Sequence, residues 1–316
     1  MIGDPPSTFF ADRAWHGTVS VIDNTRIARD TWRVRLDCPP IAERIVPGQF
    51  IMLRLTGCDD PLLGRPLALY DTALDETGRA VSLDVVYLVA GKLTSRLARF
   101  KPLQEVDVWG PLGNGFSPRP VGHLLLVAGG IGQTPFLALA QECLAGRAYG
   151  ESQRLGWHAH ASVGMPLGAG QSPPRVTLCY GARSADLLAG VDDFRRLGVE
   201  VLISTDDGTA GHHGLVTDLL EQALDRAGRV AIDKDRMNHL DNLLIVCCGP
   251  EPMMHAVAKI AKSRGVPCEV SLETPMACGI GICFSCVAKV RDAAGKWDYR
   301  RTCVEGPVFP AELIEF

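Results

Sequence analysis

Apolar and polar positions alternate along the first third of the chain and predict short β-strands. Within residues 15–118, the runs 32–36, 50–55 and 81–89 alternate with the period of two that a half-buried strand requires. Proline and glycine separate these runs, and one helical stretch, 93–99, interrupts them. Many short strands at such close intervals predict an antiparallel β-barrel.

From residue 122 onward the pattern changes to continuous apolar strands that alternate with helices. The first strand leads into a glycine-rich turn and then into a helical stretch, 136–144. The strands of this part share a continuously apolar character and are expected at 123–128, 175–180, 200–204 and 243–247. This alternation is typical of a doubly wound parallel sheet, so we expect a multi-domain β plus α/β fold.

Length and composition fit two medium domains and a small module. The chain has 316 residues, 47% of them hydrophobic and 22% charged, with a formal net charge of −4. We find no basic excess for nucleic acid, no apolar run that could span a membrane and no secretory signal, so we expect a cytoplasmic protein. The expected domains are 1–118 (barrel), 119–268 (nucleotide-binding) and 269–316 (C-terminal module), with surface insertions at 150–174 and 226–239.

Four cysteines in the C-terminal module carry the most specific chemical signal. Cys278, Cys283 and Cys286 fall within nine residues, and Cys303 follows after sixteen intervening residues. This C-x4-C-x2-C...C spacing matches the ligand pattern of a plant-type [2Fe-2S] cluster, which binds four thiolates. The segment between the last two cysteines predicts two short strands with a turn at 292–295, which would return Cys303 to the others.

Zinc and disulfides are the alternatives for these cysteines. Structural zinc sites usually have two separated C-x2-4-C pairs, whereas here one C-x2-C has an offset partner on either side. Disulfides fit poorly with a total of eleven cysteines, an odd number, and we expect the other seven to be buried apolar side chains. A zinc-stabilised binding protein remains open as a non-enzymatic interpretation, which visible absorption would test.

Two turns at the ends of apolar strands predict a nucleotide site. The first turn follows the strand 123–128 and opens a helix, where free amides and the helix dipole favour phosphate. Its candidate residues are Gly129, Gly130, Gly132 and Thr134. The second turn follows the strand 243–247 and contains Cys248, Gly249 and Pro250. Both turns are expected at the carboxyl edge of the sheet, although the first is not the strict G-x-G-x-x-G fingerprint and a tight turn without a ligand remains possible.

The segments around these turns, 127–135 and 248–254, resemble the nicotinamide-dinucleotide domain of the ferredoxin reductase superfamily. In that superfamily an FAD-binding barrel precedes the nucleotide domain, and 65–70 is similar to its flavin-binding strand. The order of barrel, nucleotide domain and cluster module, with the segments 276–286 and 303–309, narrows the resemblance. The chain resembles the electron-transfer subunits of two-subunit, NAD-dependent (class 1B) dihydroorotate dehydrogenases.

The resemblance implies an FAD site on the barrel. The residues that it places there are Arg65, Pro66, Leu67, Ala68, Val86, Tyr87, Leu88, Leu93 and Thr94. Arg65 would neutralise the pyrophosphate of FAD, and Thr94 would face phosphate at a helix start. Ala68 stands where the family usually has Ser, and Leu88 where a basic residue is common.

The resemblance also implies an oxidoreductase subunit that relays electrons. A partner, the FMN-containing catalytic subunit, would oxidise dihydroorotate to orotate in pyrimidine biosynthesis, and electrons would pass through the [2Fe-2S] cluster and FAD to NAD. We expect a heterotetramer with two copies of each chain, Phe284 and Phe309 facing the partner, and no catalytic acid or base on this chain.

Two questions stay open within the enzyme classes. The same parts occur in reductase subunits of hydrogenase or sulfur-reducing complexes and in other NAD(P)H oxidoreductases of the superfamily. Arg183 ends the second strand of the nucleotide domain, where an acidic residue favours NAD and a basic one NADP. The preference for NAD therefore rests on the resemblance.

Overall fold

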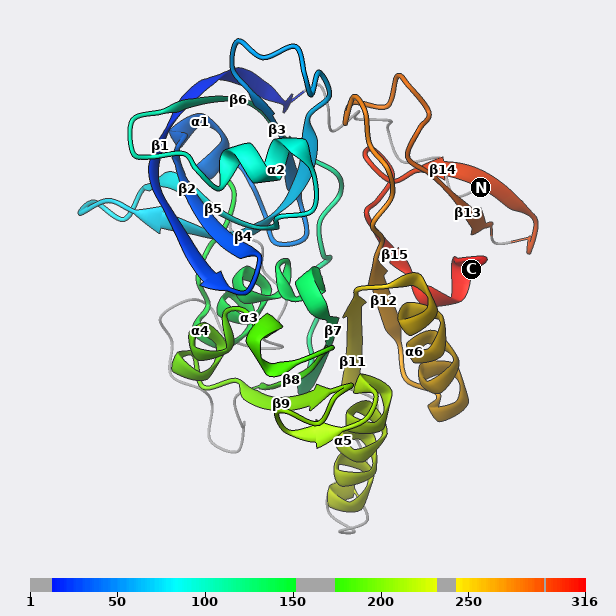
Figure 1. The fold of residues 1–316 in the computed structure, drawn as a ribbon. Coiled ribbons are helices and arrows are strands. Elements are labelled where there is room, and N and C mark those ends of the chain that lie inside the picture. Colours follow the sequence, from blue (N-terminus) through cyan, green and yellow to red (C-terminus); the bar gives the residue numbers. More distant parts are fainter. Residues whose placement is uncertain (1–12, 152–173, 232–242, 293) are drawn as a thin grey trace.

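The chain folds into a β-barrel, an α/β unit beside it and a C-terminal segment that contains a hairpin (Figure 1). The computed structural model describes residues 13–151, 174–231, 243–292 and 294–316. Most of the two expected insertions lies outside these residues. The second was expected to begin at Arg226, but helix α5 (Val216–Ala231) continues through its first residues.

The barrel closes in the strand order β1-β2-β5-β4-β3-β6, with every pair antiparallel. Its elements are β1 (Trp15–Ala28), β2 (Thr31–Asp37), α1 (Pro39–Ala42), β3 (Phe50–Leu55), β4 (Arg65–Leu74), β5 (Ala80–Leu88), α2 (Lys92–Leu97) and β6 (Glu105–Leu112). The alternation read in the sequence reflects this closure, since side chains such as Val34, Leu36 and Leu53 point into the barrel and are buried. The predicted barrel is confirmed, and the helical stretch expected at 93–99 is present as α2, whereas the short helix α1 was not expected.

The α/β unit contains a seven-stranded sheet in the order β10-β9-β8-β7-β11-β12-β15. Its strands are β7 (His123–Gly129), β8 (Arg175–Ala182), β9 (Glu200–Thr205), β10 (His212–His213), β11 (Leu243–Cys248), β12 (Cys268–Ser271) and β15 (Val308–Pro310). All neighbours are parallel except β15, which pairs antiparallel with β12. The predicted doubly wound sheet is confirmed.

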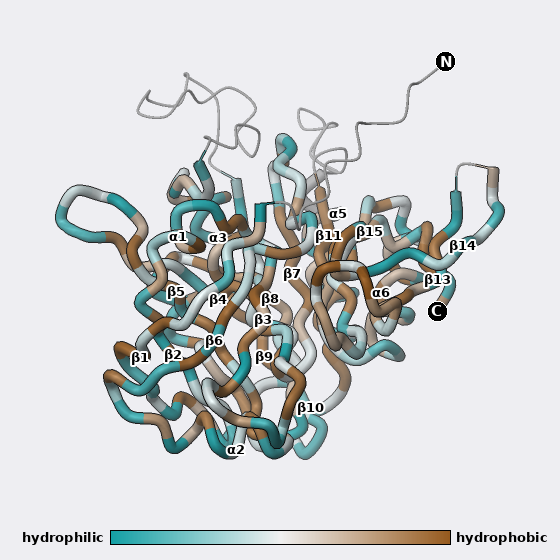
Figure 2. Tube along the Cα trace, turned by 90° about the horizontal axis from the view of Figure 1, so that it is seen from above, coloured by the Kyte–Doolittle hydropathy of each residue, from teal (hydrophilic) through white to brown (hydrophobic). Residues whose placement is uncertain are grey.

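Helices cover both faces of this sheet. The remaining elements are η2 (Gly130–Gln133), α3 (Phe136–Ala145), η3 (Ala185–Leu187), α4 (Val191–Arg196), α6 (Glu251–Arg264), β13 (Val287–Arg291), β14 (Trp297–Arg301) and η5 (Ala311–Leu313). Leu124 and Leu126 of β7 pack on one face with residues of α3 and α4, while Leu125 and Val127 pack on the other face with α5 and α6. Apolar residues accordingly concentrate along β7, β8 and β11 in Figure 2.

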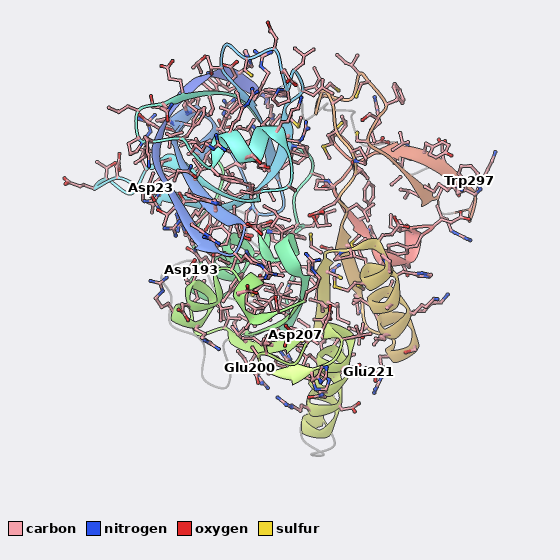
Figure 3. The ribbon with its side chains drawn as sticks, in the orientation of Figure 1. Asp23, Asp193, Glu200, Asp207, Glu221 and Trp297 are labelled. Atoms are coloured by element: carbon pink, nitrogen blue, oxygen red, sulfur yellow. The ribbon has the colours of Figure 1, made fainter. Side chains whose placement is uncertain are left out.

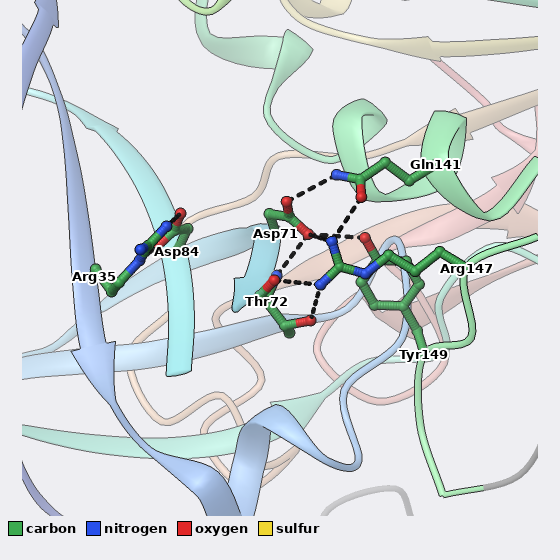
Figure 4. Close-up of polar contacts among 7 residues, drawn as sticks. All are labelled: Arg35, Asp71, Thr72, Asp84, Gln141, Arg147 and Tyr149. Atoms are coloured by element: carbon green, nitrogen blue, oxygen red, sulfur yellow. Dashed lines mark hydrogen bonds and ion pairs between the residues drawn. The ribbon is translucent and has the colours of Figure 1, made fainter. Parts of the chain in front are cut away.

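A polar network joins the barrel to the α/β unit (Figure 4). Asp71 of β4 accepts hydrogen bonds from Gln141 Nε2 of α3 at 2.8 Å and from Tyr149 OH at 2.9 Å. Its carboxylate also lies 3.0 Å from Arg147, whose guanidinium bonds Thr72 Oγ1 at 2.9 Å as well. Because the partners come from both units and are largely buried, the network fixes how the two units sit against each other.

The C-terminal segment is attached to both units. Strand β15 adds to the sheet, and Asn114, which follows the barrel strand β6, donates to the carbonyl of Val308 at 2.8 Å. The expected boundaries at 118 and 268 remain predictions; the second falls inside β12, after its first residue, and β12 and β15 both belong to the sheet of the α/β unit. Among the described helices, none is long and apolar enough to cross a membrane.

Candidate flavin, nucleotide and cluster sites

A cavity of about 740 Å³ lies between the barrel and the α/β unit. Its lining includes every residue that the sequence suggested for FAD: Arg65, Pro66, Leu67, Ala68, Val86, Tyr87, Leu88, Leu93 and Thr94. They come from β4, β5 and the first turn of α2, which pairing of β4 with β5 brings together. The opposite wall contains Thr134 and residues 271–276, which follow β12. The size is within the usual range for cofactor sites.

The polar groups of this cavity suit a bound anion. Arg65 donates only to the backbone carbonyls of Leu63 at 3.1 Å and Gly64 at 2.9 Å, and it has no acidic partner among the described residues. Its charge is therefore available to a phosphate group. Thr94 Oγ1 accepts hydrogen bonds from the amides of Ala90 and Gly91. The side chain of Tyr87 is buried in the barrel core, so it packs the barrel and is not free to bind an anion.

A second cavity, of about 590 Å³, lies at the carboxyl edge of the sheet. Gly129, Gly130, Gly249 and Pro250 line it, whereas Thr134 and Cys248 line the flavin cavity instead. The two predicted turns therefore meet in space, as strand pairing of β7 with β11 requires.

Gly132 lines neither cavity and serves the packing of the two turns. A Cβ atom at this position would lie 2.2 Å from the carbonyl oxygen of Cys248 and 2.8 Å from the amide nitrogen of Gly249. Only glycine allows the backbones to approach this closely, which is the packing role known for glycines of dinucleotide-binding turns.

Arg183 stands at the far end of the nucleotide cavity. It also borders a smaller cavity of about 510 Å³ with Arg29, Asp186 and Asp207. Arg29 is paired with Asp186 at 2.9 Å, whereas Arg183 has no ion pair among the described residues. The surroundings of Arg183 thus carry both signs of charge, so the choice between NAD and NADP stays open.

The four predicted cluster cysteines gather as two pairs. The Sγ atoms of Cys286 and Cys303 lie 3.2 Å apart and both residues are buried. Cys283 is exposed on the preceding loop, and a hydrogen bond couples its thiol to that of Cys278. The predicted hairpin is present as β13 and β14, and it returns Cys303 to Cys286.

The arrangement of two thiol pairs suits a two-iron cluster held by four cysteines. The Ser285 amide lowers the pKa of Cys283 to about 7, and the hydrogen bond between Cys286 and Cys303 lowers the pKa of Cys286 to about 6 while it raises that of Cys303. Cys283 and Cys286 therefore reach the thiolate form that iron binds most readily.

The loop before the hairpin has a backbone that only glycine supports at two positions. Gly279 has φ +72° and Gly281 has φ +81°, and an added Cβ would lie 2.5 Å from Met52 and 2.6 Å from Val304, respectively. Trp109 Nε1 of the barrel donates to the carbonyl oxygen of Cys278 at 2.9 Å, which anchors the loop on β6.

The cluster site and the flavin cavity share a wall. Phe50 lines the flavin cavity and also belongs to the apolar group that contains Cys286 and Cys303. Met276 has the same two environments. The sequence did not point to either residue. An apolar side chain in a strand or loop carries no sequence signal that it will contact two sites.

The two phenylalanines that were expected to face the partner differ in exposure. Phe284 is 63% exposed and has φ +57°, with the guanidinium of Arg301 5.3 Å from its ring centroid. Phe309, in contrast, is buried in the core beside Val270, so the expectation that it faces a partner is wrong. Its position on β15 explains this, because that strand was not foreseen as part of the sheet.

Comparison with known proteins identifies the family. Residues 18–116 match the oxidoreductase FAD-binding domain, and residues 273–315 match the iron-sulfur cluster binding domain of dihydroorotate dehydrogenase B. The dihydroorotate dehydrogenase B (NAD(+)), electron transfer subunit, of Desulforamulus reducens is 33% identical over 286 residues, 90% of this chain and 92% of the relative. The chain belongs to this family. The resemblance inferred from the sequence is thus confirmed.

A further relative in this family and two solved structures of the same fold are also similar to this chain. The electron transfer subunit of Geobacillus thermodenitrificans is 33% identical over 93% of this chain and 96% of the relative. The NADH-dependent reduced ferredoxin-NADP oxidoreductase structure has a TM-score of 0.69 at 26% identity and covers 94% of this chain and 89% of its own. The ferredoxin reductase in carbazole 1,9a-dioxygenase, with TM-score 0.57 and 18% identity over 80% of this chain and 67% of its own, shows the shared fold.

Proposed function

We propose that this chain relays electrons from a partner dehydrogenase to NAD through a [2Fe-2S] cluster and FAD. The observation that carries the proposal is the continuity of the three sites. The cluster cysteines share the wall formed by Phe50 and Met276 with the flavin cavity, which in turn adjoins the nucleotide cavity. Short distances between successive sites are what a relay requires.

The chain's own residues supply binding and position. Arg65 offers an unpaired charge to the FAD pyrophosphate, and the amides of the turns at Gly129 and Gly249 offer donors to the dinucleotide. Cys278, Cys283, Cys286 and Cys303 would hold the cluster. When bound, FAD supplies the conversion between hydride transfer and single-electron transfer, so no acid or base from this chain is needed.

The partner in this proposal is the catalytic subunit of dihydroorotate dehydrogenase, which oxidises dihydroorotate to orotate in pyrimidine biosynthesis. Exposed apolar side chains surround the exposed Cys283, with Ile282 73% exposed and Phe284 63% exposed. An apolar patch with a backbone-constrained aromatic residue is typical of a protein interface. In this proposal the patch faces the partner's redox centre, and two copies of each chain form a heterotetramer.

A cytoplasmic location is also part of the proposal. All eleven cysteines are free, including the pair Cys247 and Cys248 in the sheet core. Cysteine-rich chains without disulfides are typical of reducing compartments.

Reconstitution with the catalytic subunit tests this function. The two purified chains together should reduce NAD+ when dihydroorotate is added, and neither chain should do so alone. The rival function is reduction of another partner, such as ferredoxin, which the likeness to a ferredoxin-NADP oxidoreductase favours. Failure of dihydroorotate to reduce NAD+ in the complex, together with NADH-dependent reduction of ferredoxin, would support the rival.

A further inference from the structure

Three described residues line both the flavin cavity and the nucleotide cavity: Leu88, Ile131 and Glu273. Leu88 and Ile131 are apolar. The other charged residues of the two cavities line only one of them, with Arg65 in the flavin cavity and Arg183 and Asp206 in the nucleotide cavity. Glu273 is therefore the one charged side chain, within the described part of the chain, at the junction of the two cavities.

Glu273 has no stabilising partner among the described residues. It follows β12 by two residues, its side chain is exposed to solvent, and no hydrogen bond or ion pair engages it. Desolvation by the surrounding protein raises its pKa, and no neighbouring charge contributes to that shift. Cys248 lies close enough that the charge of Glu273 helps to raise the pKa of the Cys248 thiol, after the larger effect of burial. Glu273 is therefore a carboxylate without a counter-charge at the junction of the two cavities.

The position of Glu273 relative to bound cofactors follows from the proposed function, on which this inference rests. Hydride transfer needs the reacting atoms within about 3.5 Å of each other. The rings of a flavin and a nicotinamide must therefore meet where the two cavities meet, beside Glu273. The nicotinamide ring carries a positive charge in NAD+ and none in NADH.

We propose that Glu273 makes the nucleotide site prefer the oxidised, positively charged nicotinamide over the reduced, neutral one. The carboxylate attracts the ring of NAD+ and loses this attraction once the ring is reduced. The site would then take up the electron acceptor and release the product readily, and it would also lower the reduction potential of the nucleotide while it is bound. Leu88, which lines the same two cavities, adds no charge that would oppose that of Glu273.

Binding measurements on the oxidised protein, purified with its FAD and cluster, test the proposal. Three ligands are compared by calorimetry at pH 8: NAD+, the neutral-ring analogue 1,4,5,6-tetrahydro-NAD, which cannot donate hydride, and ADP-ribose, which lacks the ring. Glu273→Gln should weaken NAD+ binding about fivefold, the effect of one partly solvated charge near contact distance. It should leave the other two ligands within twofold of the wild type.

Matched variants separate this effect from general damage. Glu273→Asp keeps the charge and should retain most of the preference, and Glu221→Gln removes an exposed carboxylate from α5, away from both cavities (Figure 3), and should change nothing. Retention of the flavin absorbance shows that each variant is folded. The proposal is overturned if Glu273→Gln leaves NAD+ binding unchanged or weakens all three ligands alike. If the wild type binds none of them, the nucleotide site itself is wrong and the proposed function falls with it.

Discussion

Substitution of Gly132 by alanine should separate the two turns that form the nucleotide site. The added methyl carbon would lie 2.2 Å from the carbonyl oxygen of Cys248, 2.5 Å from its carbonyl carbon and 2.8 Å from the amide nitrogen of Gly249. Ordinary contacts begin at 3.4 Å, so the first pair must move apart by 1.2 Å, the difference between 3.4 and 2.2. All three neighbours are backbone atoms, which cannot rotate away as a side chain would.

The cost follows from this geometry. Overpacking a well-packed interior costs about 1–3 kcal/mol, and we expect about 3 kcal/mol here because two backbone segments must shift. The same shift moves the amides at Gly130 and Gly249 relative to each other. We expect the displaced amides to weaken NAD+ binding about tenfold, which corresponds to about 1.4 kcal/mol of lost interaction with the nucleotide.

Two measurements check the prediction for Gly132→Ala. Urea unfolding gives the loss of stability, and calorimetry with NAD+ gives the loss of affinity. Gly228→Ala is the control, since nothing lies within 4 Å of the added methyl on helix α5 and alanine should stabilise that helix by up to about 1 kcal/mol. Wild-type stability and NAD+ affinity in Gly132→Ala would refute the packing role of this glycine.

Three further substitutions address the other parts of the molecule. Arg147→Met should destabilise the protein by about 3 kcal/mol in urea unfolding, because it leaves the largely buried Asp71 without its counter-charge; unchanged stability would mean that the network does not hold the two units together. Cys283→Ser should abolish electron transfer to the partner while NADH oxidation by artificial flavin acceptors continues, and survival of both activities would exclude the relay. Phe284→Ala should weaken binding to the catalytic subunit by about tenfold or more in a titration, with the visible spectrum of the cluster unchanged; equal affinity would remove this side chain from the interface.

The sequence predicted the fold well where local pattern and global structure agree. The alternation of the barrel strands and the continuous apolar strands at β7, β8 and β11 record directly which side chains are buried. The edge strand β15 escaped prediction, because it is three residues long and its place depends on pairing with β12, not on its own pattern. The error at Phe309 follows from this.

The candidate sites likewise contain residues that the sequence could predict and residues that it could not. The four cysteines and the two turns could be found because their residue types and spacing are tied to chemistry. Glu273 and Phe50 could not be found from the sequence. Glu273 lies between the two cavities and Phe50 between the flavin cavity and the cluster site, and only the folded chain reveals these positions. Gly132 was predicted as a cofactor-binding residue, and the structure shows that it lines neither cavity and packs the two turns together.

The central claim is that electrons pass from the cluster through FAD to NAD. The most direct measurement adds NADH anaerobically to the purified chain with its FAD and cluster oxidised, which runs the relay in reverse. NADH delivers two electrons as hydride to the flavin, and the relay predicts that the flavin passes one of them on, so that the electron paramagnetic resonance signal of the reduced cluster appears as NADH is consumed. Flavin reduction with a cluster that stays oxidised would contradict it.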